Sequence, residues 1–69
     1  MRLKELRAEK GVTQNEVASA ILSTPLTYSR YERGEREPDI STLCRLADYF
    51  GVTIDEVVGR GAKSDGTDL

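Results

Sequence analysis

The chain has 69 residues, with ten lysines and arginines against twelve aspartates and glutamates, so its formal net charge is -2. This length allows one small domain, and the absence of a long apolar run excludes a membrane span or secretion signal, so we expect a cytoplasmic protein. A single cysteine and no histidine exclude a disulfide framework, a cysteine–histidine metal centre and histidine-based catalysis, so we expect neither a cofactor nor an enzyme.

Two helices are predicted in the first 21 residues. Leu3 and Leu6 fall at helical spacing, and Gly11 suits a left-handed C-cap that ends the first helix. Thr13 and Glu16 form a capping box, in which each residue satisfies the other's backbone amide, and this box opens the second helix. The predicted inward residues of the second helix are Val17, Ala18 and Ile21.

The third predicted helix has two different faces. Thr24 is a suitable N-cap, and Pro25 fits the first helical position, where a missing amide costs nothing. The helix is expected to end near Arg33, because Gly34 can adopt a positive φ and Pro38 disfavours helix just upstream. The predicted inward stripe holds Tyr28, Tyr31 and Glu32, and the opposite stripe holds Leu26, Ser29, Arg30 and Arg33.

Two further helices are predicted in the second half of the chain. Asp39 is a plausible N-cap for the fourth helix, which Gly51 ends. Thr53 and Glu56 form a second capping box and open a short fifth helix. Cys44 is expected to be a small, partly buried residue of the fourth helix. The expected inward residues are Ile40, Leu43, Leu46, Ala47 and Phe50 in the fourth helix and Ile54, Val57 and Val58 in the fifth.

The composition changes after Gly59. Residues 60–69 contain no periodic apolar side chains, so we expect a disordered C-terminal tail beyond a single domain of residues 1–59. No segment alternates apolar and polar residues in the manner of a strand. The predicted fold class is therefore all-α, a compact globule of five helices.

Three segments carry a family resemblance: RLKELRAEKGVTQNEVA, SRYERGEREPD and LCRLADYFGVTIDEVVG. In this order and at this spacing they resemble the Cro/repressor-type helix-turn-helix family, or xenobiotic-response-element family of transcriptional regulators, over residues 2–59. The resemblance implies a lambda-repressor-like DNA-binding domain whose second helix lies across the DNA backbone and whose third helix enters the major groove. It also implies a phage-type, prophage-type or bacterial repressor.

The chain departs from the family pattern at two positions. Family members usually have glycine in the turn where this chain has Leu22, which would either prolong the second helix or adopt a strained left-handed conformation. Tyr28 stands where the family has a small aliphatic residue, and we expect it to pack in the core instead of sending its hydroxyl to solvent or phosphate. The family pattern at Arg7 and Glu32 implies a structural ion pair between them.

The predicted DNA-binding residues begin at the N-termini of the second and third helices. The resemblance implies that Gln14 contacts a phosphate, with a solvent-exposed helix start as the plain alternative. Since Pro25 and Leu26 cannot form side-chain hydrogen bonds, their expected contact is with thymine methyl groups, although an exposed leucine without a role is equally common. The predicted contacts at these two helix starts are Thr13, Gln14, Thr24, Pro25, Leu26 and Thr27.

The remaining predicted contacts are polar residues farther along the third helix. Arg30 lies one turn beyond Leu26, where its guanidinium could hold guanine O6 and N7 or a phosphate. Ser29, Arg33 and Arg36 would suit backbone phosphates, with a solvated hydroxyl as the equal alternative for Ser29. For Arg36, a solvated loop of mixed charge is the alternative.

The partner is expected to be double-stranded DNA, although the charge is unevenly distributed. Residues 1–38 hold seven basic and six acidic side chains and residues 39–69 hold three and six, so the acidic end would turn away from DNA. One short helix reads few base pairs, so we expect a homodimer on a palindrome, with Val57, Val58 and the end of the third helix at the dimer surface. The alternative is a protein-interaction adaptor or antitoxin-type module with weak or no DNA readout. A protein partner could also control activity.

Overall fold

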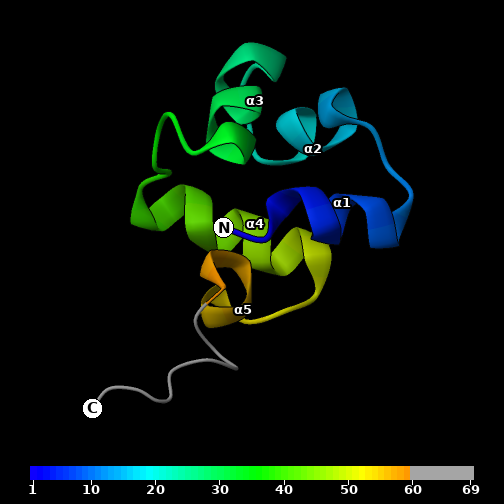
Figure 1. The fold of residues 1–69 in the computed structure, drawn as a ribbon, viewed down its shortest axis with the longest axis vertical. Helices are drawn as coiled ribbons and strands as arrows, with labels where there is room; N and C mark the ends of the chain where they lie inside the picture. The colour runs from blue at the N-terminus through cyan, green and yellow to red at the C-terminus, as the bar shows by residue number, and fades with distance from the viewer. Residues whose placement is uncertain (60–69) are drawn as a thin grey trace.

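Five helices joined by short turns form the part of the chain that the structure describes, residues 1–59 (Figure 1). In this computed structural model the helices are α1 (Leu3–Lys10), α2 (Gln14–Ala20), α3 (Pro25–Arg33), α4 (Ile40–Phe50) and α5 (Ile54–Val58). No strand occurs within residues 1–59, and the predicted all-α class is confirmed. The tail predicted for residues 60–69 lies outside the described residues.

The helices are arranged around a central layer of α1 and α4. Figure 1 shows the α2 and α3 pair on one side of this layer and α5 on the other. One buried cluster joins all five helices, and its members are Leu3, Leu6, Val17, Ala18, Ile21, Tyr28, Tyr31, Leu43, Leu46, Ala47 and Val57. The backbone amide of Arg2 donates to the carbonyl of Val57 at 2.9 Å, so the start of the chain is fastened to α5.

Side-chain caps begin four of the five helices, at Thr13, Thr24, Asp39 and Thr53. At the start of α2 the hydroxyl of Thr13 accepts from the amide of Glu16 at 3.1 Å, while the carboxylate of Glu16 accepts from the amide of Thr13 at 2.7 Å. Thr53 and Glu56 form the same reciprocal pair at α5. The helix starts predicted from capping chemistry are therefore confirmed.

Four predictions for residues of α4 and α5 were wrong: Ile40, Cys44 and Ile54 are exposed instead of inward or partly buried, and Val57, buried as expected, does not reach the surface assigned to a dimer. Ile40 is 72 % exposed and Cys44 is also exposed. The buried stripe of α4 is centred on Leu43, Leu46 and Ala47; with about 100° between successive residues, Ile40 lies at its edge and Cys44 outside it. Val57 is completely buried, so it cannot contribute to a dimer surface in this fold.

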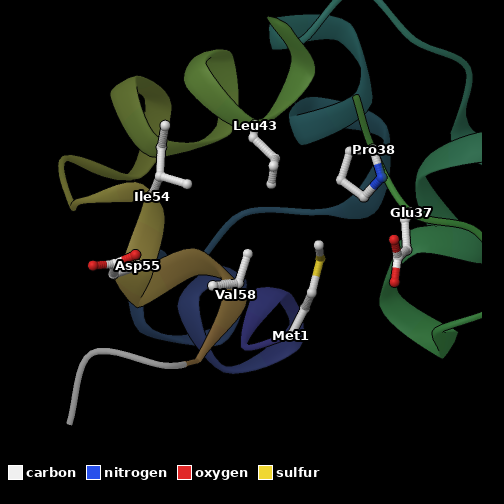
Figure 2. Close-up of a pocket in the computed structure, with 7 residues that line it drawn as sticks. All are labelled: Met1, Glu37, Pro38, Leu43, Ile54, Asp55 and Val58. Atoms are coloured by element: carbon white, nitrogen blue, oxygen red, sulfur yellow. The ribbon is translucent and has the colours of Figure 1, made fainter. Parts of the chain in front are cut away.

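A cleft of about 430 Å³ opens beside α5 (Figure 2). The residues that line it are Met1, Glu37, Pro38, Leu43, Ile54, Asp55 and Val58. The side chains of Met1 and Val58 point into the cleft, and those of Pro38 and Leu43 face them. Glu37 and Asp55 stand on opposite sides of this apolar centre, and Ile54 is 37 % exposed beside Asp55.

The turn between α2 and α3 places Leu22 in the left-handed conformation. Its φ is 60°, and no other residue except glycine has a positive φ within residues 1–59. The amide of Leu22 donates to the carbonyl of Ser19 at 3.2 Å, and the amide of Ser23 donates to the carbonyl of Ala18 at 2.8 Å. These are the two hydrogen bonds of a Schellman motif, in which α1, α3 and α4 use glycine at the left-handed position. Of the two alternatives predicted for Leu22, the strained one is adopted.

Leu22→Gly should raise the free energy of unfolding by about 1 kcal/mol, because it removes the clash of a Cβ in the left-handed region. The side chain is 77 % exposed, so its loss removes little buried area. In a domain of this size the change corresponds to an increase of about 4–8 °C in Tm, measurable by thermal unfolding followed by circular dichroism. Leu22→Ala is the control: it keeps the Cβ and should bring no gain, whereas an equal gain would show that backbone strain is not the source.

Candidate nucleic-acid interface

The α2 and α3 pair is fixed from the inside by the residues that its two helices bury. Val17, Ala18 and Ile21 lie in the core from α2, and Tyr28 and Tyr31 lie there from α3. This packing turns the opposite stripe of α3 outward. The observed faces of α3 are those that the spacing of its residues predicts.

The outward stripe of α3 combines an apolar end and a basic end. Pro25 and Leu26 are exposed in the first turn, with 60 % of Leu26 accessible. One turn farther along, Arg30 is exposed and makes no side-chain hydrogen bond or ion pair with any residue of the described part of the chain. Arg36 is exposed on the loop after α3. A ligand lying along α3 would therefore contact apolar side chains at the first turn of the helix and the guanidinium of Arg30 at the next turn.

Two of the three threonines predicted to contact DNA, Thr13 and Thr24, also serve as helix N-caps. The hydroxyl of Thr24 accepts from the amide of Thr27 at 3.2 Å and donates to the hydroxyl of Thr27 at 3.0 Å. Thr13 is held in the capping box with Glu16. Both N-cap hydroxyls therefore already have partners, while the hydroxyl of Thr27 keeps its proton for another acceptor.

Gln14 is held by a contact that the sequence does not reveal. Its Nε2 donates to Oε1 of Glu32 at 2.9 Å, a hydrogen bond that joins the start of α2 to the inward side of α3. Residues 18 positions apart give no periodic signal, so this contact appears only when the helices are packed. The bond uses one of the two amide protons of Gln14 and leaves the other for an external acceptor.

Arg7 completes the network around Glu32. Its Nε donates to Oε2 of Glu32 at 2.6 Å, and its Nη1 donates to the carbonyl of Val12 at 3.2 Å. The two residues that the family resemblance pairs are thus in direct contact, with 23 % of the Arg7 side chain and 5 % of the Glu32 side chain exposed. The ion pair links α1 to α3, and the hydrogen bond to Val12 ties the loop before α2 to the same guanidinium.

Burial and hydrogen bonding act in opposite directions on Glu32. Burial alone would raise the pKa of its carboxyl, but the hydrogen bonds from Arg7 and Gln14 hold that pKa below its usual range. Tyr28 lies in the same place and is completely buried, as predicted, with no hydrogen-bond partner for its hydroxyl within the described residues. Burial and the nearby Glu32 carboxylate raise the pKa of Tyr28 far above its usual value. Glu32 is therefore charged and Tyr28 neutral at pH 7.

Arg33 is engaged at the surface by two neighbours. Its Nη1 donates to the hydroxyl of Ser29 at 2.5 Å, and its Nε and Nη2 donate to the two carboxylate oxygens of Glu35 at 2.9 and 3.1 Å. Hydrogen bonding to Arg33 lowers the pKa of Glu35, and the same contact raises the pKa of Arg33. No periodicity or motif in the sequence predicts that Glu35 is a direct partner of Arg33.

Two further features are absent from the described residues. Within residues 1–59, no group of three or more histidine, cysteine, aspartate or glutamate side chains is placed to hold a metal ion. None of the helices in this part of the chain is long and apolar enough to cross a bilayer.

Comparison with known proteins supports the family resemblance. A family model described as helix-turn-helix matches residues 3–57. The chain is 39 % identical to the HTH-type transcriptional regulator ImmR of Bacillus subtilis, over 99 % of this chain and 55 % of that protein. It is 39 % identical to the cryptic phage CTXphi transcriptional repressor RstR of Vibrio cholerae, over 83 % of this chain and 51 % of that protein.

A third relative is the SPbeta prophage-derived uncharacterized HTH-type transcriptional regulator YonR of Bacillus subtilis, which is 41 % identical over 78 % of this chain and 50 % of that protein. The chain spans about half the length of these curated relatives. No solved structure gives a significant match. The relatives are named as regulators and not as enzymes, in agreement with the prediction from the sequence. With a family model that matches most of its length, the chain belongs to the helix-turn-helix family.

Proposed function

We propose that this domain binds DNA sequence-specifically as part of a transcriptional repressor, with α3 in the major groove of a palindromic operator. The observation that carries the proposal is the two-faced character of α3. Tyr28 and Tyr31 anchor one side in the core, while Leu26 and Arg30 stand exposed on the other. A helix supported in this way can enter a groove without disturbing the fold.

Different side chains of this surface suit different parts of the DNA. Pro25 and Leu26 fit the methyl groups of thymines, because they offer apolar surface and no hydrogen-bonding group. Arg30 has the donors to hold O6 and N7 of guanine. Within residues 1–59 its guanidinium makes no hydrogen bond or ion pair that DNA binding would have to break. Gln14, steadied by Glu32, and Arg36 suit phosphates on the flanking backbone.

The relatives favour repression as the regulatory outcome. RstR is named as a phage transcriptional repressor, and YonR is named as a prophage-derived transcriptional regulator. The likeness covers the domain described here and about half of each relative, so it supports a shared mode of DNA recognition.

A protein-interaction adaptor with the same fold is the second candidate. The observation that favours it is the exposure of two large apolar side chains, Leu22 at the turn and Leu26 in α3. Apolar surface on a small protein is typical of a site that another protein covers. In this case DNA affinity would be weak and without sequence preference.

Selection from a random duplex library at about 150 mM salt separates the two candidates, because non-specific phosphate binding is already weakened under these conditions. Enrichment of an inverted repeat with centres about 34 Å apart would support a dimeric reader of DNA. Failure to enrich any sequence, with the protein shown to be folded by circular dichroism, would favour the adaptor.

The cleft beside α5 is the surface that we propose for the homodimer. Met1, Leu43, Ile54 and Val58 supply its apolar lining, and the exposed edge of Ile54 makes that lining accessible. Association there would cover Met1 and Ile54, which are 48 % and 37 % exposed.

Ile54→Glu should shift the protein from dimer to monomer and weaken operator binding by about tenfold or more, because burying a carboxylate at an apolar interface is strongly unfavourable. The substitution suits the first turn of a helix, where an acidic side chain is favourable, so the domain should stay folded. Sedimentation velocity would measure the mass. Cys44→Ser, on the exposed face of α4, is the control and should leave the mass unchanged. A monomeric wild type would contradict the dimer.

A further inference from the structure

The carboxylate of Glu35 occupies the binding edge of Arg33. The guanidinium of Arg33 offers Nε and one Nη along a single edge, and these two donors contact the two oxygens of Glu35 at 2.9 and 3.1 Å. An arginine binds a phosphate through the same fork of parallel hydrogen bonds. Arg33 therefore already holds an anion of the shape and charge that a DNA backbone would present.

The position of Glu35 is set by the end of α3. Gly34 takes a left-handed conformation with a φ of 76°, and the next amide, that of Glu35, donates to the carbonyl of Arg30 at 2.9 Å. This Schellman hydrogen bond brings the chain back over the last turn of α3. The carboxylate is consequently held beside Arg33, and it is close enough to Arg30 for that positive charge to help lower the pKa of Glu35.

Ser29 holds Arg33 from the other side. Its hydroxyl accepts from Nη1 of Arg33 at 2.5 Å, one helical turn away, and this bond does not involve the edge that Glu35 occupies. If the carboxylate left, the guanidinium would still be oriented by Ser29 with its binding edge open. Arg33 thus forms an anion-binding site that is already oriented and is occupied by a carboxylate of the same chain.

We propose that Glu35 is an internal competitor for the DNA backbone, which occupies Arg33 and so lowers the affinity of the domain for duplex DNA of any sequence. This inference rests on the proposed function and adds to it a residue that sets binding strength without reading bases. A phosphate must displace the carboxylate to reach Arg33, and the displaced charge then lies beside the backbone and repels it.

The test compares Glu35→Gln with wild type on a short duplex of scrambled sequence and on the selected operator, by fluorescence anisotropy between about 50 and 200 mM salt. Glu35→Gln should bind both duplexes about three- to tenfold more tightly at the low-salt end. Its plot of log Kd against log salt should be steeper by about one phosphate contact. The ratio of the two affinities should stay the same, because phosphates carry no sequence information.

Two further variants isolate the contact from a general change in charge. Glu9→Gln removes one negative charge from the exposed surface of α1 and should give a much smaller gain. In the background of Arg33→Gln, the substitution of Glu35 should give no more gain than Glu9→Gln does. All these residues are exposed, so thermal unfolding should be unchanged.

The outcomes separate this inference from the function on which it rests. Wild-type binding to the operator with no gain, or with a loss, in Glu35→Gln would overturn the competitor and leave the proposed function standing. An equal gain with and without Arg33 would also overturn the competitor. A folded wild type that binds neither duplex would overturn both.

Discussion

Arg7→Ala should lower the free energy of unfolding by about 3 kcal/mol, because it leaves the carboxylate of Glu32 charged and without its cation in a site where only 5 % of that side chain is exposed. The value lies at the lower end of the range for broken buried pairs, since water reaches part of Arg7. Small domains have a total stability of about 5–15 kcal/mol, so the substitution would remove roughly a fifth to three fifths of it. Urea unfolding followed by circular dichroism would measure the loss.

The exposed pair at the end of α3 provides a matched control. Arg33→Ala removes an arginine that is also hydrogen-bonded to a glutamate, but about half of each of these two side chains is exposed. Both pairs join a guanidinium to a carboxylate, but the pair of Arg33 is much more exposed to water, so Arg33→Ala should leave unfolding unchanged within error. If both substitutions cost the same, burial would not be what makes the Arg7 pair matter.

The pH dependence of unfolding gives a second test of the same pair. In the folded wild type the pKa of Glu32 is held below its ordinary value of 4.5, so its contribution to stability is complete above that value. The contribution is lost as the pH falls through the lowered pKa. In Arg7→Ala burial is no longer offset by the arginine, so the pKa of Glu32 should rise and protonation should relieve the unpaired charge.

The difference in stability between wild type and Arg7→Ala should therefore shrink as the pH falls from 7 to about 4. Urea titrations of both proteins at several pH values would follow it. A difference that stayed constant over this range would mean that Arg7 acts through packing of its side chain and not through its charge. DNA binding by Arg7→Ala at pH 7 should fall only in proportion to the unfolded fraction.

The helices could be predicted closely because their ends are determined by local chemistry. The capping box of Thr13 and Glu16 and the left-handed Gly34 each lie within a few residues of the boundary that they set. Leu22 was ambiguous because a leucine is compatible with continuing a helix. The Schellman hydrogen bond from Ser23 to Ala18 that ends α2 requires a left-handed residue at position 22, and leucine is not typical of that conformation.

Contacts between distant residues were beyond what the sequence alone predicts. The hydrogen bond from Gln14 to Glu32 depends on how two helices are placed relative to each other, and periodicity contains no such information. The exposure of Ile40 and Ile54, which helical spacing places inward, depends in the same way on which neighbours reach each helix. The outward face of α3, in contrast, follows directly from helical spacing, and the DNA contacts assigned to it stay predictions.

Arg30→Ala should weaken operator binding by about 1–3 kcal/mol, which is roughly a tenfold to hundredfold rise in Kd. Within residues 1–59 the guanidinium of Arg30 has no hydrogen bond or ion pair to lose, so folding should be unaffected. This separates Arg30 from Arg7, whose loss would impair binding through unfolding. Titration of the selected operator by fluorescence anisotropy, with the Tm measured in parallel, would show whether the two effects are independent.

The pattern of loss across operator variants identifies what Arg30 contacts. If its fork holds O6 and N7 of a guanine, Arg30→Ala should also lose the preference at one base pair in each half-site. Equal weakening on every sequence, with a salt dependence reduced by about one contact, would assign Arg30 to a phosphate instead. Lys4→Ala removes a positive charge from the exposed side of α1 and is the control for overall charge. Binding by Arg30→Ala no weaker than by Lys4→Ala would remove Arg30 from the DNA face, and with it the strongest polar contact that α3 offers.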